Sequence, residues 1–136
     1  MRLSELFREV EFDGSIKNDA DINLVTDDSR LVRPGSLFVC IRHRSFDGHT
    51  AAVDALASGA AAVVTQDRLG LENELRVADS RSAYARLCAA LCNHPERKLR
   101  MIGVTGTNGK TTVTTLIRNI LSDSGTKTLL TGTVCN

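Results

Sequence analysis

Apolar residues in the N-terminal part of the chain follow two different spacings. The opening segment has helical spacing, which predicts a short amphipathic helix over residues 3–10. Its apolar positions are Leu3, Leu6, Phe7 and Val10. Short apolar runs bounded by polar turn residues are instead typical of buried strands. Such runs predict strands over residues 22–26, 36–41, 60–65 and 74–79.

Two segments between and after these strands have the composition of helices. Residues 50–59 are rich in alanine and end at a glycine, which suits the position after a helix C-cap. Residues 81–93 follow Asp79 and Ser80, either of which can cap a first helical turn, and Pro95 is expected to stop that helix. The apolar face of this helix is formed by Tyr84, Leu87, Cys88 and Leu91. Strands that alternate with helices predict a domain of the α/β class.

The charged segment HPERK, residues 94–98, precedes a fresh apolar run, and we expect a domain boundary there. The first domain would comprise residues 1–96 and the second residues 97–136. The second begins as a βαβ unit, with a strand, a glycine-rich loop, a helix and a strand expected over residues 99–105, 106–110, 111–125 and 126–132. One βαβ unit cannot cover both faces of a parallel strand pair, so we expect a larger domain that is cut short here.

Composition excludes several classes of protein. The 136 residues are 42% hydrophobic and 24% charged, which is typical of a soluble globular protein. The net charge is +1 with scattered basic residues, and there is no Trp and one Tyr, so a nucleic-acid-binding surface is not expected. No apolar run reaches the length of a membrane span and the N-terminus has no signal-peptide pattern, so we expect a cytoplasmic protein without membrane insertion.

The four cysteines are Cys40, Cys88, Cys92 and Cys135, and none forms a C-x-x-C pair. Cys88 and Cys92 are spaced as two metal ligands on one helix face would be, but no His or Cys cluster completes such a site. We therefore expect four buried, reduced thiols.

The stretch GVTGTNGKTT, residues 103–112, lies between the expected strand and helix of the second domain. Glycines allow a backbone turn to approach an anion closely, and the N-terminus of a helix attracts phosphate. Lys110 would supply a charge toward the β- and γ-phosphates of a nucleotide, and Thr111 a hydroxyl to Mg²⁺. The pattern G-x-x-x-x-G-K-[ST] is not met, because Val104 stands where it requires glycine. A tight turn with a solvated lysine is the alternative, but three glycines before K-T-T favour phosphate binding.

A second Mg²⁺ ligand is not evident in the sequence. Enzymes with such loops usually supply an acidic residue from another strand. After Lys110 the chain contains one acidic residue, Asp123, at the far end of the same expected helix.

Residues 26–49 form a second polar cluster around the expected strand at 36–41. Acidic and hydroxyl groups gather before that strand and cationic groups after it, as the sequence TDDSR…RHRSFDGH shows. Cations with hydroxyl groups suit a phosphate or diphosphate. An ordinary solvated hairpin, with Asp28 or Ser29 capping a turn, explains the same spacing.

Together the two clusters resemble one family. The pattern T-D-D-S-R-x-V-x-P-G-S-L-F-V, then D-G-H, then G-V-T-G-T-N-G-K-T-T is similar to that of the Mur ligases, over essentially the whole chain. The N-terminal pattern most resembles the MurE type, the UDP-N-acetylmuramoyl-L-alanyl-D-glutamate ligases of peptidoglycan synthesis. The resemblance implies three domains: one for the UDP-sugar, a central ATPase and a C-terminal domain for the incoming amino acid. Residues 1–96 would be the first domain and residues 97–136 the opening of the second.

The resemblance also implies roles for individual residues. Contacts to the UDP-sugar would come from Asp27, Ser29, Arg44, Ser45 and Phe46. ATP would be held by Thr107, Asn108, Gly109, Lys110, Thr111 and Thr112, with Thr111 as the ligand of Mg²⁺. The family's catalytic modified lysine, its metal-binding glutamate and its amino-acid-selecting arginine would lie beyond Asn136, so no catalytic residue is expected within the chain. His43 stands where the family usually has glycine.

Three functions remain open on this basis. The first is an ATP-dependent amide ligase that adds diaminopimelate or lysine to UDP-MurNAc-L-Ala-D-Glu through an acyl phosphate, the chain by itself being inactive without the rest of the central domain and the C-terminal domain. The second is a MurF-like ligase that adds D-Ala-D-Ala. The third is a non-catalytic UDP-sugar-binding module from a truncated gene. A generic P-loop NTPase would leave the first domain unexplained.

Overall fold

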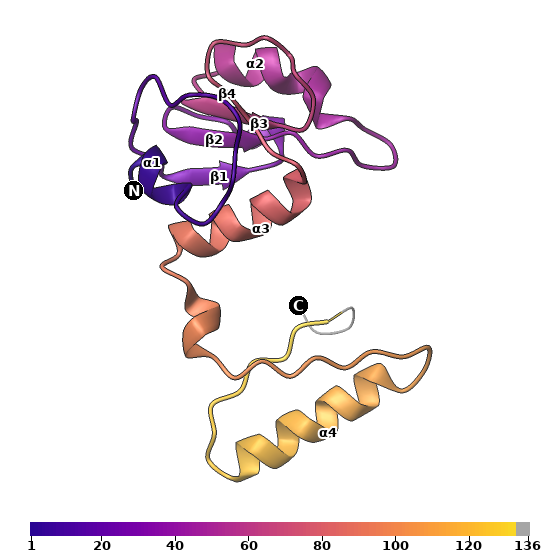
Figure 1. Ribbon diagram of the computed structural model, residues 1–136. Helices are drawn as coiled ribbons and strands as arrows, with labels where there is room; N and C mark the ends of the chain where they lie inside the picture. The colour runs from indigo at the N-terminus through magenta and orange to yellow at the C-terminus, as the bar shows by residue number, and fades with distance from the viewer. Residues whose placement is uncertain (133–136) are drawn as a thin grey trace. The chain divides into compact units, whose positions relative to one another are not determined.

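The structure, a computed structural model, describes residues 1–132 (Figure 1). The chain forms two compact units, Met1–Leu99 and Arg100–Asn136. The boundary expected after residue 96 falls inside the 3₁₀ turn η3 (Pro95–Lys98), which belongs to the first unit. The roles assigned to the two domains stay predictions at this point.

The first unit is built on a parallel sheet of four strands in the order β1-β2-β3-β4. The strands are β1 (Leu24–Thr26), β2 (Ser36–Val39), β3 (Ala62–Thr65) and β4 (Glu74–Arg76). Neighbours pair in parallel throughout, for example Val25 with Leu37 and Phe38 with Val63. Every residue of β2 and β3 is buried, as expected for parallel strands that are covered on both faces.

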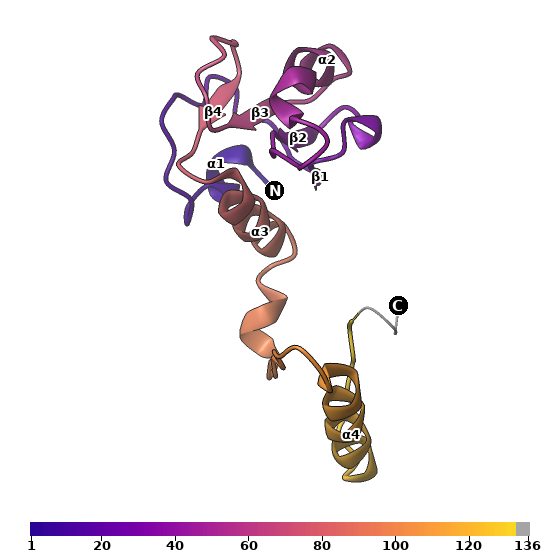
Figure 2. The same cartoon turned by 90° about the vertical axis from the view of Figure 1, so that its right-hand side faces the viewer.

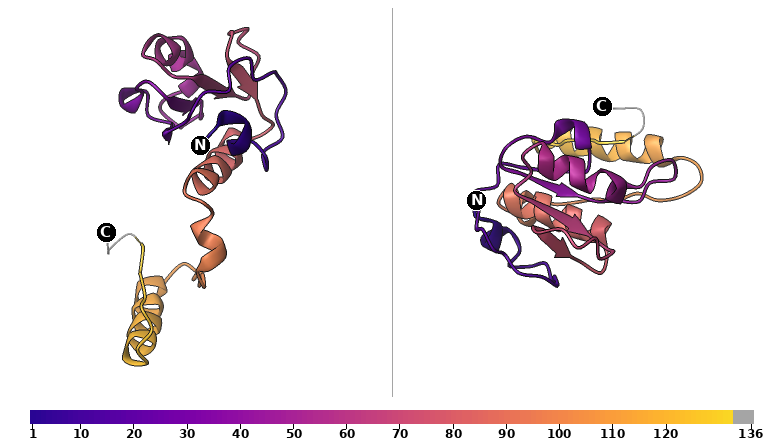
Figure 3. Two further views of the ribbon diagram at one scale, coloured as in Figure 1. Left: turned by 90° about the vertical axis from the view of Figure 1, so that its left-hand side faces the viewer. Right: turned by 90° about the horizontal axis from the view of Figure 1, so that it is seen from above.

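Helices cover the two faces of the sheet, as Figure 2 and the left panel of Figure 3 show. On one face lie α1 (Leu3–Leu6) and α3 (Ser80–Leu91), which pack with Leu37 and Val39 of β2. On the other lies α2 (Ala52–Ala57), which packs with Phe38 and Cys40. Successive residues of β2 therefore serve opposite layers of the core, because side chains alternate along a strand.

The α/β class is confirmed for this unit, while several element bounds differ from the sequence prediction. The helix expected over residues 3–10 is a single turn, and the one expected over residues 50–59 begins with the 3₁₀ turn η2 (Gly48–Ala51). Asp79 caps α3 as expected, accepting from the amides of Arg81 and Ser82. Pro95 does not stop α3, which ends at Leu91 and is followed by two residues of positive φ, Asn93 and His94.

The second unit contains one helix among the described residues, α4 (Lys110–Asp123). The strands expected over residues 99–105 and 126–132 are not formed, so this part of the prediction was wrong. A strand needs a hydrogen-bonded neighbour, and a parallel pair needs cover on both faces, which one helix cannot give. Apolar side chains of this unit are consequently exposed, among them Met101, Ile102, Leu116, Ile120 and Leu129. Within residues 1–132, no helix is both long and apolar enough to cross a bilayer.

Candidate functional site

The glycine-rich loop takes the backbone shape that its glycines permit. Gly106 and Gly109 have φ values of +147° and +75°, in a region that residues with a side chain rarely adopt. An added Cβ at Gly109 would have nothing within 4 Å, so the conformation and not the available space calls for glycine. Gly109 is the N-cap of α4, and no side chain caps that helix. The amides of the first turn of α4 are therefore free to bind an anion.

Lys110 begins α4 and its side chain folds back over the loop. Its ammonium group donates to the carbonyl oxygens of Gly106 and, at 3.3 Å, of Thr107. These contacts place the ammonium group of Lys110 against the backbone of the loop that the phosphate would approach. Thr111 and Thr112 are exposed, and no partner of their hydroxyl groups is found among the described residues. The six residues expected to hold ATP thus lie in one turn and the helix start that follows it.

This loop fits the phosphates of a nucleotide better than it fits a metal ion. It combines uncapped helix amides with one ammonium group, which suits an anion. For Mg²⁺ it offers the hydroxyl group of Thr111, and within residues 1–132 no group of three or more His, Cys, Asp or Glu side chains could hold a metal ion. The metal role of Thr111 stays a prediction.

The cysteines are free thiols as far as they are described. Cys40 is buried, Cys88 is half-buried and Cys92 is exposed, while Cys135 lies outside the described residues. The expectation that all are buried was wrong for Cys92, which is the C-cap of α3, and holds only in part for Cys88. Burial raises the pKa of the Cys40 thiol to about 12 and keeps it protonated.

The polar residues of the first unit gather at the carboxyl ends of β1 and β2. Asp27 follows β1, and its Oδ2 lies 3.3 Å from Nε2 of His43 in the loop after β2. The structure therefore brings the acidic turn before β2 and the cationic loop after β2 against each other. Tyr84 of α3 is near Asp27, and its pKa is raised to about 12 by burial and by the nearby Cys88 and Asp27. Parallel sheets commonly bind ligands at this edge.

Ser29 lies between Asp28 and Arg30, whose side chains form an ion pair with each other. Asp28 caps the 3₁₀ turn η1 (Ser29–Leu31) by accepting from the amide of Arg30, and the guanidinium of Arg30 also binds the same carboxylate. These hydrogen bonds lower the pKa of Asp28 to about 2. The charge of Arg30 is thereby committed, while the half-buried Ser29 has no hydroxyl partner among the described residues.

The loop after β2 has a closed base and an exposed tip. At its base, Arg42 Nε donates to Asp47 Oδ2 at 3.1 Å, and the other side of the guanidinium contacts Asp67. The amide of His43 donates to the carbonyl of Phe46 at 2.8 Å and closes the turn. The tip consists of Arg44, Ser45 and Phe46, all exposed. Within the described chain Arg44 has no ion-pair partner, so it is the uncommitted cation of this loop.

Three further residues of this edge were missed by the sequence analysis. Gln66 and Asp67 follow β3, and Arg81 lies in the first turn of α3, where its guanidinium donates to the carbonyl of Arg42 at 2.7 Å. Both Gln66 and Asp67 directly follow an expected buried strand, which is the signal that could have placed them at the carboxyl edge.

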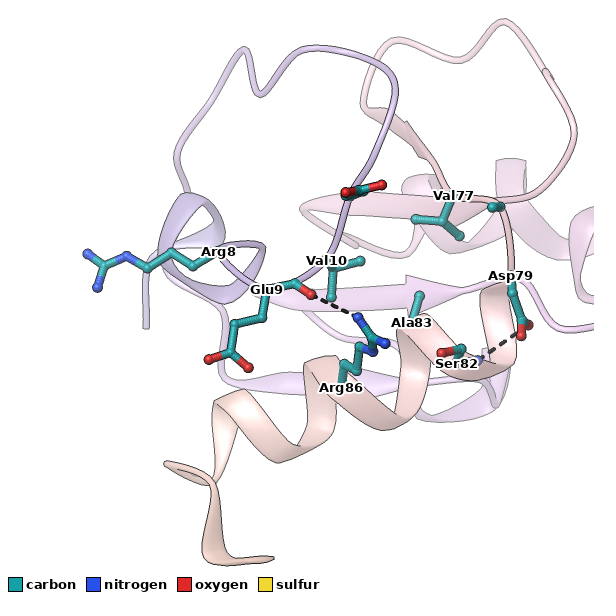
Figure 4. A pocket seen from close by; sticks show the side chains of 10 residues that line it. Arg8, Glu9, Val10, Val77, Asp79, Ser82, Ala83 and Arg86 are labelled. Carbon is teal, nitrogen blue, oxygen red and sulfur yellow. Dashed lines mark hydrogen bonds between the residues drawn. The ribbon is translucent and has the colours of Figure 1, made fainter. Parts of the chain in front are cut away.

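A groove of about 550 Å³ lies elsewhere on the first unit (Figure 4). It runs between the segment after α1 and the N-terminal half of α3, and its walls carry both signs of charge. Arg86 donates to the carbonyl of Glu9 at 3.3 Å across it, and Asp79 accepts from the amide of Ser82. None of the residues expected to bind substrate lines this groove.

Comparison with known proteins places both units in one family. Residues 21–95 match the family described as "Mur ligase family, catalytic domain", and residues 104–136 match the "Mur ligase middle domain". The chain is 41% identical over 140 residues to a UDP-N-acetylmuramoyl-L-alanyl-D-glutamate–2,6-diaminopimelate ligase of Syntrophomonas wolfei, which covers 98% of this chain and 28% of that protein. It is 47% identical over 115 residues to the ligase of the same name from Geobacillus kaustophilus, covering 84% and 24%. The chain thus spans about a quarter of the length of these curated relatives.

Solved structures of similar fold carry related names. A UDP-N-acetylmuramoyl-L-alanyl-D-glutamate–2,6-diaminopimelate ligase matches with a TM-score of 0.69 and 30% identity over 92% of this chain and 26% of that one. MurF from Acinetobacter baumannii matches with a TM-score of 0.63 and 26% identity, covering 88% and 27%. MurF from Thermotoga maritima, solved in complex with ADP, matches with a TM-score of 0.55 and 28% identity, covering 74% and 23%.

Proposed function

Because this chain belongs to the Mur ligase family, we propose that it supplies the UDP-sugar-binding domain and the phosphate loop of an ATP-dependent ligase that extends UDP-MurNAc-L-Ala-D-Glu in peptidoglycan synthesis. The observation that carries the proposal is the identity of 41% over nearly the whole chain to a ligase named for this substrate. The remainder of the central domain and a C-terminal domain would complete the enzyme. The cytoplasmic location expected from the sequence is part of this proposal.

In the first unit, the loop after β2 would bind the diphosphate and the uridine of the substrate. Arg44 is the cation available for the diphosphate, because Arg42 is occupied by Asp47 and Asp67. Ser45 and, from the neighbouring turn, Ser29 would donate hydroxyl hydrogen bonds. The ring of Phe46 is 47% exposed and offers an apolar face to the base.

Asp27 differs from the other four expected contacts because its side chain carries a negative charge. Its carboxylate would repel a diphosphate, and in the structure it is directed to His43. We therefore assign Asp27 to hydrogen bonds with sugar or base hydroxyl and amide groups, or to support of the loop through His43. The presence of His43 where the family usually has glycine gives this chain a contact between the two turns that glycine could not make.

In the second unit, the first-turn amides of α4 and the ammonium of Lys110 would hold the β- and γ-phosphates. The ammonium would exchange the carbonyls of Gly106 and Thr107 for phosphate oxygens. The hydroxyl of Thr111 would contribute one ligand to Mg²⁺. ATP would supply the phosphoryl group that activates the D-glutamate side-chain carboxylate as an acyl phosphate. The incoming amine would then attack the acyl carbon, form the amide and release inorganic phosphate. The chain's own part in that step would be to bind and orient.

Diaminopimelate is the amine that the relatives' names favour, and we extend it to this chain as part of the proposal. The MurF-like alternative is supported by the MurF structures at a TM-score of 0.63. The structure named for the diaminopimelate ligase matches with the higher TM-score of 0.69 and covers more of the chain, which favours the MurE-like function. Competition between UDP-MurNAc-dipeptide and UDP-MurNAc-tripeptide for the chain separates the two, because a MurE-like site needs to admit only the dipeptide.

The test is calorimetric binding of UDP-MurNAc-dipeptide and of Mg-ADP to the 136-residue chain. We expect both to bind, Arg44→Met to weaken binding of the sugar nucleotide alone, and Lys110→Met to weaken binding of ADP alone. Arg33→Met, at the amino edge of β2, and Lys127→Met, after α4, are matched controls that remove the same charge away from the sites. Binding of the sugar nucleotide without any ADP binding would instead support the non-catalytic module. A chain that binds neither would refute the proposal.

A further inference from the structure

His49 lies behind the loop after β2, in the turn η2, and it is almost completely buried. Its side chain is 5% exposed, and both ring nitrogens have partners. Nδ1 lies 2.6 Å from Asp47 Oδ1, and Nε2 accepts from the backbone N–H of Gln66 at 3.1 Å. Because the amide can only donate, Nε2 carries no proton and the proton of the neutral ring is on Nδ1, where it is donated to Asp47.

These two bonds connect the base of the loop to the sheet. Asp47 is the residue that closes the base through Arg42, and it also accepts from the backbone amide of His49 at 3.0 Å. Gln66 is the first residue after β3 and lies next to β2 across the sheet. His49 is therefore a buried connection between the base of the loop after β2 and the first residue after β3.

Gln66 carries the connection on to α3. Its Oε1 accepts from the hydroxyl of Ser80 at 2.9 Å, and its Nε2 donates to the carbonyl of Ala78 at 3.2 Å. Ser80 is completely buried at the start of α3. Hydrogen bonds thus run from Arg42 through Asp47, His49 and Gln66 to Ser80, and they link the loop base, β3 and the β4–α3 turn. Within the described residues no buried side-chain polar atom is left without a partner.

We infer that His49 and Gln66 are positioning residues that fix the direction of the loop tip, residues 44–46, for a nucleoside diphosphate. The inference rests on the proposed function, and it adds to it two residues that need not touch the ligand. The tip is exposed and makes few contacts of its own, so its orientation depends on the base. A base that is held before binding lowers the entropy lost when the ligand orders the tip.

Two substitutions separate the two bonds of His49. Asn at this position retains a donor where Nδ1 lies and removes the acceptor for the Gln66 amide, whereas Gln retains an acceptor at the far position and removes the donor to Asp47. We expect His49→Asn to raise the dissociation constant for UDP-MurNAc by about tenfold, the low end of the loss known for outer residues that orient the ligands of metal sites. Binding of Mg-ADP should be unchanged. His49→Gln should weaken UDP-MurNAc less, because the connection to β3 survives.

The matched control is Thr65→Val, one residue before Gln66. Thr65 is completely buried, and its hydroxyl donates at 2.9 Å to Glu74 of β4, the strand on the opposite edge of β3 from β2. The control therefore lowers the stability of the same unit without changing the loop base, and UDP-MurNAc affinity should remain within about twofold of that of the parent chain. Ser80→Ala leaves His49 in place and removes only the hydrogen bond between the Gln66 side chain and α3. This substitution should also weaken UDP-MurNAc binding, by a smaller factor than His49→Asn. It replaces His49→Asn as the test if that variant does not fold.

Amide hydrogen exchange provides a readout that does not require ligand. The amides of His43 and Gln66 should lose protection in His49→Asn and keep it in Thr65→Val. If the parent chain fails to bind UDP-MurNAc, the proposed function fails and exchange alone decides the positioning role. Unchanged protection at His43 in His49→Asn, or an unchanged affinity in a parent chain that does bind, would overturn the inference.

Discussion

Gly48 provides a stringent test of how closely the loop base packs on the sheet. It is the first residue of η2, between Asp47 and His49, and its amide donates to the carbonyl of Ile41 at 3.0 Å. A Cβ at this position would lie 2.8 Å from the amide nitrogen of Ile41, 3.0 Å from its carbonyl oxygen and 3.1 Å from Cα of Cys40. All three are backbone atoms of the segment that continues β2, so none can move aside by rotating a side chain.

The size of the effect follows from that contact. Ordinary contact begins at 3.4 Å, so the difference from 2.8 Å requires the turn to move by about 0.6 Å. Overpacking of this kind costs about 1–3 kcal/mol, and a backbone obstacle places Gly48→Ala near 3 kcal/mol. The matched control is Gly70→Ala, where nothing lies within 4 Å but φ is +73°. There only backbone strain acts, at about 1 kcal/mol.

Urea unfolding followed by tyrosine fluorescence measures this difference. The chain has one Tyr and no Trp, and Tyr84 lies in α3, so the signal reports the first unit alone. Gly48→Ala should also weaken UDP-MurNAc binding, because the displaced turn contains the base of the loop, while Gly70→Ala should not. A free energy of unfolding for Gly48→Ala within about 0.5 kcal/mol of the parent chain, or a larger loss in Gly70→Ala, would refute the reasoning.

Three further outcomes are expected. The pKa of Asp47 is lowered to about 2 from 3.8, chiefly by hydrogen bonds from the backbone and ring of His49. The stabilising effect of the Asp47 carboxylate is therefore present above about pH 4 and is lost as the pH falls toward 2. The same fluorescence assay should show a flatter acid dependence of stability in Asp47→Asn, and equal slopes would contradict this. Thiol alkylation at pH 8 followed by peptide mass spectrometry should label exposed Cys92 much faster than buried Cys40, and comparable rates would show that the core opens readily. Glu9→Gln should break the ion pair with Arg97, in which one guanidinium nitrogen donates to both carboxylate oxygens, and accelerate amide exchange in η3 with little change in the unfolding midpoint. Unchanged exchange would mean that the pair does not hold this segment.

The second unit shows where sequence patterns stop predicting structure. Residues 99–105 and 126–132 have the composition of strands, yet neither is one in the structure. Strand formation is decided by partners that are distant along the chain, and the exposure of Met101, Ile102 and Leu129 shows that residues 100–132 do not supply such partners. The helix between them formed where expected, because helical hydrogen bonds join residues four apart.

The same distinction applies to the candidate sites. Residues 107–112 were predicted as a phosphate loop from neighbours in the sequence, and positive φ at Gly106 and Gly109 with a helix starting at Lys110 agrees with the geometry such a loop requires. Their role in binding ATP remains a proposal. For the loop at residues 42–46 the sequence indicated a cluster of cations, but it could not say which of Arg42 and Arg44 was free. That was decided by Asp67, which is 25 residues from Arg42 along the chain.

By itself the sequence determined the alternation of strands and helices in the first unit, the glycine-rich loop before α4, and the resemblance that leads to the family. These features depend on periodicity and on residues close together in the chain, where side-chain type sets the backbone directly. Only the tertiary structure decided that Asp27 meets His43, and that Gln66 meets both His49 and Ser80, 17 and 14 residues away. Contacts of this kind form when parallel strands bring their carboxyl ends to one edge, and no local pattern specifies which polar groups will pair there.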